Sequence, residues 1–440
     1  MGFLPAHAGG LRTKRNPMHI HTLLNQSFRH KGFVYGRAWT DDQYQSVIIP
    51  VRPRKNSRAR CGQCGTPSPV FHAYRSRRFQ LPSLWDTPMY LEYTVRRVTC
   101  PQCGVHTEDI PWSVGTSGKS PLTTAMAHHL ASLARLLSWK DVAHRCNATW
   151  DLVATSVLWL VTWGIKHRSL DGITSLGVDE IQYTKGHKYL TLVYQIDDHQ
   201  RRLLWIGKER TKECFNTFFN FMGQSRCAAV RYVCSDMWKA YLTVIAQRVP
   251  QALNILDRFH IAKHLNEAVN QTRCDEVSAL RRQGKPAYLH KSRWVWLKRR
   301  SRLKPNQKSM LRELLDINLR TVKAYLLKER FDHLWSYTSP TWAGKFITQW
   351  CRDVKRYKTL PRMRHVAQMI KQHQGLILNY FRVKKATSKT LSSGIVEGFN
   401  NKAKLCIRKS YGFRSDKYRE AALFLALGDL PEPEATLRFA

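Results

Sequence analysis

The sequence predicts a multidomain α/β protein. Its 440 residues exceed the ~100–200 residues typical of one domain, and 43% of them are hydrophobic, enough for a buried core. Two matched Cys-x-x-Cys pairs occur in the first quarter of the chain. The apolar periodicity changes from helical to strand-like near residue 171 and returns to helical after residue 260. We therefore expect a cysteine module, a helical segment, an α/β core and a large all-helical insertion, in that order.

The charge of the chain predicts a polyanionic partner. Lys and Arg number 72 against 31 acidic residues, which gives a net charge of +41 spread along the whole sequence. Such a chain repels itself unless an anion compensates, so we expect nucleic acid. The most apolar run, residues 150–165, is shorter than the ~20 residues that span a bilayer, which disfavours a membrane. The odd count of eleven cysteines and the lack of a secretory signal pattern favour a cytoplasmic protein.

Residues 1–60 are expected to form an amino-terminal lead with a short β segment. The Gly-, Pro- and Arg-rich start should lack regular structure, and strand-like runs follow at about 32–38 and 44–51. Translation beginning at Met18 instead of Met1 is an alternative that the sequence leaves open.

Residues 61–112 are predicted to bind zinc. Cys61 and Cys64, and then Cys100 and Cys103, form two C-x-x-C-G turns whose four thiolates suit a closed tetrahedral zinc site. The β pattern of residues 90–98 between them predicts a hairpin, and the whole would be a zinc-ribbon-like module. Four unrelated reduced cysteines, or a redox pair, are the alternatives. We expect contact with DNA phosphate through the basic residues of this module, which are Arg75, Arg77, Arg78, Arg96 and Arg97.

Residues 117–168 are predicted to be helical and to bind DNA. Helical patterns cover residues 121–137, 138–146 and 151–163, with a short break at 147–150. Two helices joined by a turn of three or four residues are typical of a helix-turn-helix. An ordinary helical hairpin produces the same pattern.

Residues 171–260 change to short strand-like runs and are predicted to form an α/β domain. The order of elements, three strands, a helix, a strand, a helix and a strand, is that of a ribonuclease-H-like core, although other α/β domains share parts of it. The expected strands are 176–183, 189–196, 203–208, 230–235 and 253–257, and the expected helices are 211–222 and 238–248.

Residues 261–390 are predicted to form a helical insertion with a very basic stretch at 285–308. Within it, Lys298, Arg299 and Arg300 are candidate phosphate contacts. Trp294 and Trp296 lie among these cations, where they would either stack on splayed bases or be buried between solvated basic residues.

Residues 391–430 are expected to complete the core with one helix, and residues 431–440 to form a loose tail. Ser392 and Ser393 are good N-cap residues, and Gly412 suits the carboxyl end of the helix. Acidic, amide and basic side chains share one face of this helix because they recur at steps of four, three and four, at Glu397, Asn401, Lys404 and Arg408. Such a face is either a metal-binding acid beside DNA-backbone contacts or an ordinary solvated surface.

Two aspartates are predicted to join Glu397 in a metal site. Asp179 and Asp236 end the first and fourth predicted strands, where ligands bind in α/β folds. Because neighbouring strand residues face opposite sides, only one of Asp179 and Glu180 can point into this site, and we choose Asp179. Three carboxylates that converge require divalent cations, and two Mg²⁺ (or Mn²⁺) ions would support phosphodiester chemistry.

Several motifs occur in an order that resembles the bacterial insertion-sequence DDE transposases of the ISL-three type. The resemblance covers about residues 20–430 and rests on both cysteine turns and on the segments 177–180, 234–238, 257–260, 396–404 and 411–413. It implies a zinc-binding and helix-turn-helix front end and a ribonuclease-H-like core interrupted by a helical insertion. By motif, Asp179, Asp236 and Glu397 would be the catalytic, metal-binding triad, with Asp257 and His260 as supporting residues.

The resemblance implies an enzyme that binds terminal inverted repeats and target DNA, and that cleaves and transfers strands of an insertion sequence. Acting on two ends makes a homodimer or larger assembly on paired DNA ends the expectation, in a bacterial, nucleoid-associated setting. One alternative is a catalytically inactive DNA-binding regulator derived from such a transposase. A metal-dependent nuclease without strand transfer is the other.

Overall fold

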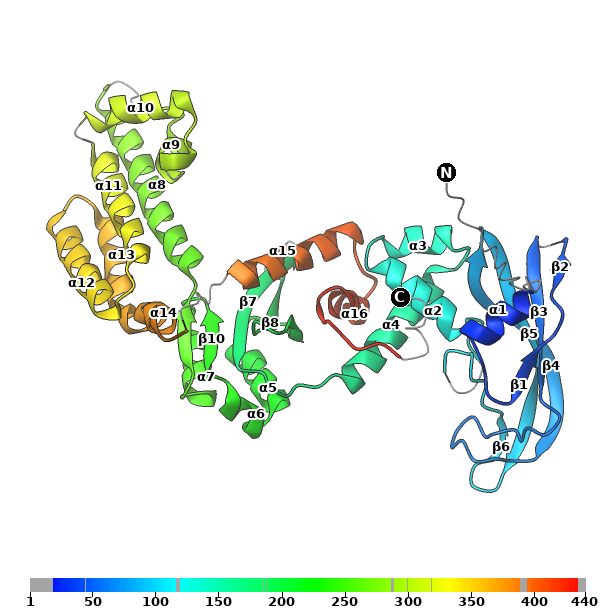
Figure 1. Ribbon diagram of the computed structural model, residues 1–440. Helices are drawn as coiled ribbons and strands as arrows, with labels where there is room; N and C mark the ends of the chain where they lie inside the picture. Colours follow the sequence, from blue (N-terminus) through cyan, green and yellow to red (C-terminus); the bar gives the residue numbers. More distant parts are fainter. Residues whose placement is uncertain are drawn as a thin grey trace, which may run out of the picture. The chain divides into compact units, whose positions relative to one another are not determined.

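The computed structural model describes residues 19–43, 45–115, 119–184, 186, 188–285, 289–298, 300–317, 319–387 and 394–433. Ser392, Ser393 and Arg299, which the sequence analysis singled out, lie outside these ranges, as do residues 1–18 and 434–440. The chain divides into two compact units. Unit 1 comprises residues 1–168, 409–426 and 430–440, and unit 2 comprises residues 169–408 and 427–429. Figure 1 labels the elements of both.

Unit 1 begins with a helix that the sequence analysis did not predict. Helix α1, Ile20–Ser27, lies in the lead that we expected to lack regular structure, so that expectation was wrong for this stretch. Leu24 is 4% exposed and packs with Ile20 and Phe28 on the core of the adjoining sheet. Tertiary burial of one apolar face, rather than helix propensity, therefore stabilises this short helix.

Six strands of unit 1 form one sheet within the described residues, in the order β1-β3-β5-β4, with β2 paired to β3 and β6 paired to β5. The long antiparallel hairpin of β4 and β5 confirms the hairpin predicted around residues 90–98 and extends well beyond it. Its apolar face buries a cluster around Trp112. The strands are β1 Phe33–Tyr35, β2 Trp39–Asp41, β3 Ser46–Pro53, β4 Val70–Leu84, β5 Thr87–Cys100 and β6 Gly104–Thr107.

Three helices follow the sheet, as the sequence analysis predicted. They are α2 Thr124–Ala134, α3 Trp139–Arg145 and α4 Trp150–His167. Side chains of Thr123, Ser138 and Thr149 accept hydrogen bonds from the first turns of α2, α3 and α4, which fixes where each helix begins. In the described ranges no single helix is long and apolar enough to cross a membrane; α3 and α4 together have that length and composition but are bent by 113°.

The carboxyl-terminal segment of the chain returns to unit 1. Helix α16, Asp416–Leu427, follows a turn whose Phe413 packs edge-on against Trp139, while Tyr418 packs edge-on against Trp150. We expected the chain to Leu430 to complete the α/β core, but nearly all of α16 groups with α2, α3 and α4 in unit 1. Glu432, expected in a loose tail, instead forms ion pairs with two basic side chains of the α2 segment, His128 and Arg135.

Unit 2 contains a five-stranded sheet in the order β11-β10-β7-β8-β9 among its described residues. β7, β8 and β9 are antiparallel neighbours, and β10 and β11 run parallel to β7. Each predicted strand and helix of this region is confirmed to within two residues at both ends, and the short helix α6 was not predicted. The elements are β7 Ser175–Thr184, β8 Lys188–Ile196, β9 Arg201–Gly207, α5 Lys212–Met222, α6 Gln224–Ala229, β10 Tyr232–Ser235, α7 Lys239–Arg248 and β11 Leu253–Leu256.

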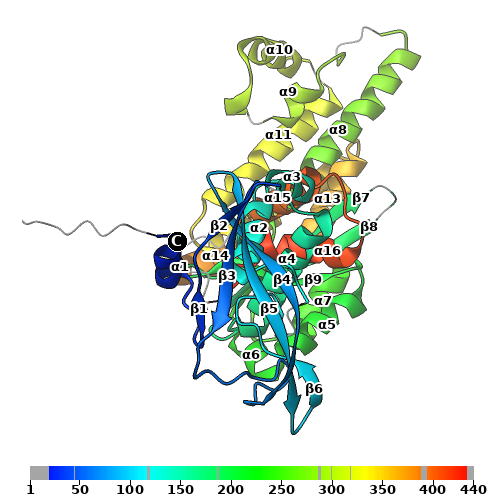
Figure 2. The ribbon, with the colours of Figure 1, turned by 90° about the vertical axis from the view of Figure 1, so that its right-hand side faces the viewer.

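The segment between β11 and the last helix of unit 2 is all helical in its described residues, as the sequence analysis predicted. Figure 2 shows its long first helix, α8, leading away from the sheet, with α11 alongside. The described elements are α8 Arg258–Arg282, α9 Arg293–Leu297, η1 Arg300–Arg302, α10 Pro305–Leu315, α11 Arg320–Asp332, η2 His333–Ser336, α12 Pro340–Arg356, α13 Pro361–Gln372 and α14 Gln374–Thr387.

Helix α15, Gly394–Lys409, packs against β7 through a close backbone approach. A Cβ atom on Gly177 of β7 would lie 2.4 Å from Val396 Cγ2 and 3.3 Å from Ile196 Cγ2. Gly177 is therefore required by the space available, since nothing larger than a hydrogen atom fits between this strand and the helix.

We expect Gly177→Ala to destabilise unit 2 by about 1–3 kcal/mol, because overpacking forces β7 and α15 apart. Thermal unfolding followed by circular dichroism measures the effect as a lower melting temperature. Gly398→Ala is the matched control on α15 itself, because its added Cβ meets no atom within 4 Å and Ala is the better helix former. Equal melting temperatures for Gly177→Ala and wild type would contradict the packing of α15 on β7.

Candidate active site and metal-binding cysteines

Three aspartates lie at one level of the unit 2 sheet: Asp236 and Asp257 directly follow the carboxyl ends of β10 and β11, and Asp179 lies within β7, which continues to Thr184. Cys234 of β10 pairs with Gly177 of β7, and extending this parallel register by two residues sets Asp236 level with Asp179. β10 pairs with β11 in the same direction, and the register places Asp257 on that level too. Ligands bind at this edge of parallel strands in α/β folds, so the topology alone gathers acidic side chains where a substrate can approach.

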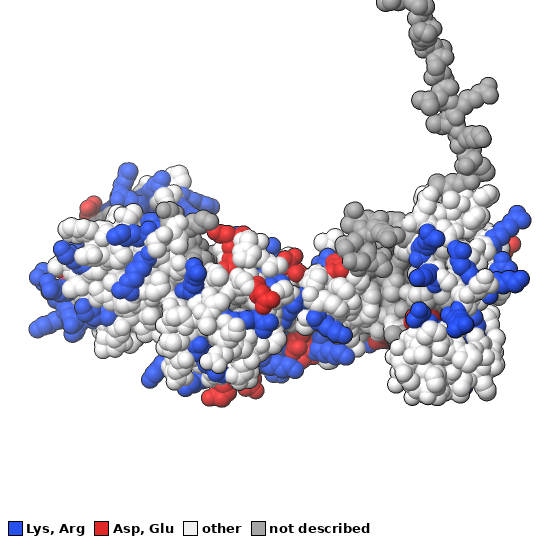
Figure 3. Space-filling view, turned by 60° about the horizontal axis from the view of Figure 1, so that its bottom comes forward, with Lys and Arg blue, Asp and Glu red and all other residues white. Residues whose placement is uncertain are grey.

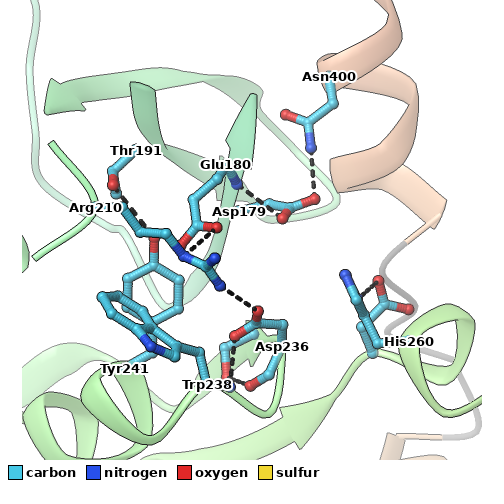
Figure 4. A network of polar contacts seen from close by, with 11 residues as sticks. Asp179, Glu180, Thr191, Arg210, Asp236, Trp238, Tyr241, His260 and Asn400 are labelled. Carbon is cyan, nitrogen blue, oxygen red and sulfur yellow. Dashed lines mark hydrogen bonds and ion pairs between the residues drawn. The ribbon is translucent and has the colours of Figure 1, made fainter. Parts of the chain in front are cut away.

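Asp179 is held by helix α15 through a buried asparagine (Figure 4). Asn400 Nδ2 donates a hydrogen bond of 2.6 Å to Asp179 Oδ2, and Asn400 Oδ1 accepts one of 2.8 Å from the Tyr194 hydroxyl. Asn400 is only 4% exposed. Burial raises the pKa of Asp179, and the backbone N–H of Glu180 and the charge of His260 oppose that rise. The tertiary contact between α15 and β7 thus fixes the orientation of this carboxylate.

Asp236 is connected to a second carboxylate by an arginine. Arg210 Nε lies 2.8 Å from Glu180 Oε2, and its guanidinium nitrogen Nη2 lies 3.7 Å from Asp236 Oδ2. The guanidinium also lies over the Trp238 ring, 4.8 Å from its centroid. The backbone N–H of Trp238 donates a 2.8 Å hydrogen bond to Asp236 Oδ1. Arg210 therefore supplies the positive charge that balances these two acids.

Glu180 is part of this network although the strand alternation argued for Asp179 alone. Its side chain is 9% exposed, and burial raises its pKa, which the hydroxyl of Tyr241 and the charge of Arg210 oppose. Tyr241, whose hydroxyl lies 3.3 Å from Thr191 Oγ1, packs on the same side (Figure 4). Glu180 and Asp179 point to opposite sides of β7, as the alternation requires, and acidic groups lie on both sides.

Asp257 and His260 form a pair at the start of helix α8. Asp257 is the N-cap, with its Oδ1 accepting from the backbone N–H of Phe259, and its Oδ2 lies 3.0 Å from His260 Nδ1. The hydrogen bond with Asp257 raises the pKa of His260, against the effect of burial. The same aspartate thus anchors the first insertion helix and orients a histidine toward the row of acids.

Glu397 and its three predicted companions lie on the exposed face of α15. Glu397, Asn401, Lys404 and Arg408 are all exposed, while the buried face is Val396, Asn400, Ala403 and Cys406. The carboxylates are not drawn to one point in this conformation. In the parts of the chain that are described, the only group of three or more His, Cys, Asp or Glu side chains with ligand atoms within 4.8 Å of one another is the cysteine cluster.

The predicted basic contacts of the zinc module differ in their surroundings. Arg96 lies against the buried Glu108, with Nη2 at 2.6 Å from Oε2, and Arg78 pairs with Asp41 and Glu92. Arg97 of β5 forms no ion pair with a described residue and lies opposite His72, whereas Arg77 lies opposite Tyr93. Internal acids therefore already neutralise part of the positive charge of this module.

The basic stretch of the insertion is exposed only in part. Trp296 is fully buried and donates to Ser292 Oγ, whereas Trp294 is 55% exposed beside Arg293. Arg300 is exposed, and Lys298 is half-buried with its Nζ 3.5 Å from Gln307 Oε1. Figure 3 shows Lys and Arg side chains gathered over the insertion helices on the face in view.

The four predicted zinc ligands come together. Sulfur atoms of Cys61, Cys64, Cys100 and Cys103 all lie within 4.8 Å of one another. The glycine after each pair, Gly65 and Gly104, has a φ of +73° and +76°, which lets each turn fold back around the metal position. Four thiolates in such a cluster match a closed tetrahedral zinc site, and hard cations such as Mg²⁺ do not favour sulfur.

These features define a zinc-ribbon protein with an acidic site at the edge of an α/β sheet. Residues 176–422 match a family described as transposase, of the ISL3 type, and residues 57–103 match the zinc-finger of the IS204/IS1001/IS1096/IS1165 transposases. Because the first match covers more than half of the sequence, the chain belongs to the ISL3 family of insertion-sequence transposases. The resemblance stated from the motifs is therefore confirmed, and the zinc-ribbon match together with the cysteine geometry supports structural zinc.

Curated relatives cover nearly the whole chain. The sequence is 29% identical over 384 residues to the transposase for insertion sequence element IS1001 of Bordetella parapertussis, which covers 86% of this chain and 91% of that protein. It is 27% identical over 407 residues to the transposase for insertion sequence element IS1557 of Mycobacterium tuberculosis, with 87% and 88% covered, in two strains.

Sequence reasoning missed Asn400, Arg210 and the contribution of Glu180. A signal for Asn400 was present, because it is the polar residue on the otherwise apolar face of α15. Glu180 was weighed and set aside on strand alternation. Arg210 follows strand β9 in a basic loop, and the residues around it do not indicate its role. That role depends on Glu180 and Asp236, which are 30 and 26 residues away in the sequence.

Removing one thiolate should abolish the zinc site. We expect Cys61→Ser to lower the zinc content from about one ion per chain to nearly none, measured by elemental analysis of the purified protein. Cys274→Ser is the control, since Cys274 is an exposed thiol outside the cluster. Retention of stoichiometric zinc by Cys61→Ser would refute the assignment of the four ligands.

The two adjacent asparagines of α15 make a matched pair. We expect Asn400→Ala to cost roughly 1–3 kcal/mol of stability, because it leaves the Asp179 carboxylate and the Tyr194 hydroxyl without their buried partner. Asn401→Ala should change stability by no more than about 0.5 kcal/mol, because Asn401 is exposed. Chemical denaturation measures both, and equal effects of the two substitutions would contradict the network.

Proposed function

We propose that this chain is an active DDE-type transposase that binds the terminal inverted repeats of its insertion sequence and catalyses metal-dependent cleavage and transfer of DNA strands. The observation that carries the proposal is the row of Asp179, Asp236 and Asp257 at one edge of the sheet, with α15 docked on Asp179. A regulator without catalysis would have no use for this concentration of buried and half-buried acids, which costs stability unless it serves a ligand.

The catalytic core is proposed to be ribonuclease-H-like. Three antiparallel strands continued by two parallel ones, in the order β11-β10-β7-β8-β9, support this assignment. Helix α5 lies between β9 and β10 in the chain, and helix α7 lies between β10 and β11, which is the element order expected of that core. The all-helical segment between β11 and α15 would be an insertion that leaves the strand order intact.

The acidic residues fit Mg²⁺ or Mn²⁺ in their chemistry. Carboxylate oxygens are the ligands these hard cations prefer, and Asp179, Asp236 and Glu397 would hold two ions. When bound, such ions would polarise the attacking and leaving oxygens of a phosphodiester. Asn400 would keep Asp179 aimed at the site, and Arg210 would do the same for Asp236. His260, held by Asp257, can bind or release a proton close to the reacting phosphate.

DNA contact is proposed over several elements. The zinc module and the α3–α4 pair, as a helix-turn-helix, would recognise the terminal repeats, and the exposed Asn401, Lys404 and Arg408 would hold backbone phosphate beside Glu397. The first turn of α4 contacts the carboxyl-terminal segment, because Arg414 lies over the Trp150 ring and forms an ion pair with Asp151. Action on two DNA ends would require at least a homodimer, with target DNA as the second substrate.

A cleavage assay tests the proposed chemistry. We expect the wild-type protein to nick a terminal-repeat duplex in the presence of Mg²⁺, and Asp179→Asn, Asp236→Asn and Glu397→Gln each to reduce nicking by at least about 10³-fold, because each removes a metal ligand. Strand transfer into a supercoiled plasmid is measured in the same reactions with pre-nicked ends.

The control is DNA binding by the same variants, which should stay within a few-fold of wild type because the substitutions leave the zinc module intact. Wild-type protein that binds the repeats without nicking them under any divalent cation would favour the DNA-binding regulator. Nicking without strand transfer would favour a simple nuclease.

A further inference from the structure

The first half of strand β4 is an exposed edge of the zinc module. Among the described residues, the first half of β4 pairs only with β5, and residues 70–76 are all exposed. A strand that covers a core buries every second side chain, but the first buried residues of β4 are Phe79, Gln80 and Leu81. Beyond that point the backbone of Gln80 forms hydrogen bonds with the backbone of Pro121 and Thr123. The segment 70–76 therefore leaves both of its faces and its outer edge open.

Two β-bulges interrupt this exposed half. The register skips from Val70 to His72, which leaves Phe71 without a partner on β5. It skips again between Ala73 and Ser76, where two residues, Tyr74 and Arg75, oppose the single residue Val95. Bulges bend a strand and re-aim side chains. Phe71 and Tyr74, the two aromatic residues at these bulges, are 61% and 58% exposed.

The exposed side chains form a small cluster of rings with cations around it. The His72 ring lies 5.2 Å from the Phe71 ring and 6.2 Å from the Tyr74 ring, in edge-on geometry. The Arg75 guanidinium lies 5.8 Å from the centroid of the Tyr74 ring. Arg97 of β5 is the residue directly opposite His72 of β4 in the antiparallel pairing.

No acidic residue occurs in β4, and Arg97 makes no ion pair with any described residue. Arg96 and Arg78, in contrast, are neutralised by Glu108 and by Asp41 with Glu92. Arg75 and Arg97 therefore place positive charge that no described acid neutralises next to the aromatic cluster of residues 71–75.

Physical arguments favour DNA as the partner of this surface. The two bulges break the regular row of backbone donors and acceptors, which blocks addition of a strand from another chain. A second copy of the chain would bring a like charge of +41, whereas DNA brings the opposite charge. Aromatic rings next to arginine are the combination that contacts bases and sugars while phosphate is held alongside.

We propose that Phe71 and Tyr74 pack against the bases or sugars of the terminal-repeat DNA, while Arg75 and Arg97 hold the flanking phosphates. The zinc site braces this surface, because Thr99 next to the ligand Cys100 bonds the backbone of Pro69 just before β4 begins. This inference rests on the proposed function. It assigns to Phe71 and Tyr74 a packing contact with DNA that does not depend on charge.

The test separates the two kinds of contact by their salt dependence, in the full-length zinc-loaded protein. We expect Phe71→Ala and Tyr74→Ala each to weaken binding to a fluorescent terminal-repeat duplex by roughly 5- to 100-fold, with the dependence of affinity on salt concentration unchanged. Arg75→Ala and Arg97→Ala should instead reduce the slope of log affinity against log salt by ~0.9 each. Fluorescence anisotropy at several salt concentrations gives both quantities.

Trp85→Ala is the matched control, because Trp85 is 90% exposed at the far end of the same hairpin and should leave binding unchanged. Zinc content and melting temperature equal to wild type show that each variant is folded. Wild-type affinity of Phe71→Ala and Tyr74→Ala would overturn the inference and leave the proposed function standing. Lost affinity accompanied by lost self-association in sedimentation would also overturn it, in favour of a second copy. Failure of the wild-type protein to bind terminal repeats would instead overturn the proposed function.

Discussion

The site depends on one buried polar contact, the hydrogen bond from Asn400 to Asp179. A carboxylate in this half-buried position loses hydration, and a directed donor offsets that loss. The donor comes from a helix more than 200 residues later in the chain, and Gly177 lets that helix approach the strand closely enough to reach. Glu397 lies three residues before Asn400 on the same helix, on its exposed face.

A second constraint is electrostatic. Unit 2 places several acids at one edge of a sheet within a chain of net charge +41. Arg210 lies between Glu180 and Asp236 and offsets part of their negative charge, and His260 forms a hydrogen bond with Asp257. The acids alone would repel a DNA backbone, and the positive charge of the rest of the chain would attract it. Divalent cations would neutralise the repulsion between the acids and the reacting phosphate.

The zinc module shows how a metal can stabilise a surface that lacks a core. Ala59, Cys61, Val98 and Cys100 form only a small buried cluster, and the neighbouring half of β4 buries almost nothing. Four thiolates on one ion would compensate for the missing apolar burial. The exposed half of β4 is then free to carry the side chains that we propose contact DNA.

The sequence by itself determined the local features. The strand and helix pattern of residues 171–260 follows from alternation of apolar residues, and the cysteine turns follow from spacing, so both were predicted at nearly their observed bounds. The same pattern placed Asp236 correctly, directly after β10, but the prediction that Asp179 ends its strand was wrong, because β7 continues to Thr184. The tertiary structure decided the rest: that Asn400 holds Asp179, that Arg210 joins two acids, and that α16 groups with the amino-terminal helices. These contacts join residues far apart in the chain, and periodicity reports only neighbours within a few residues.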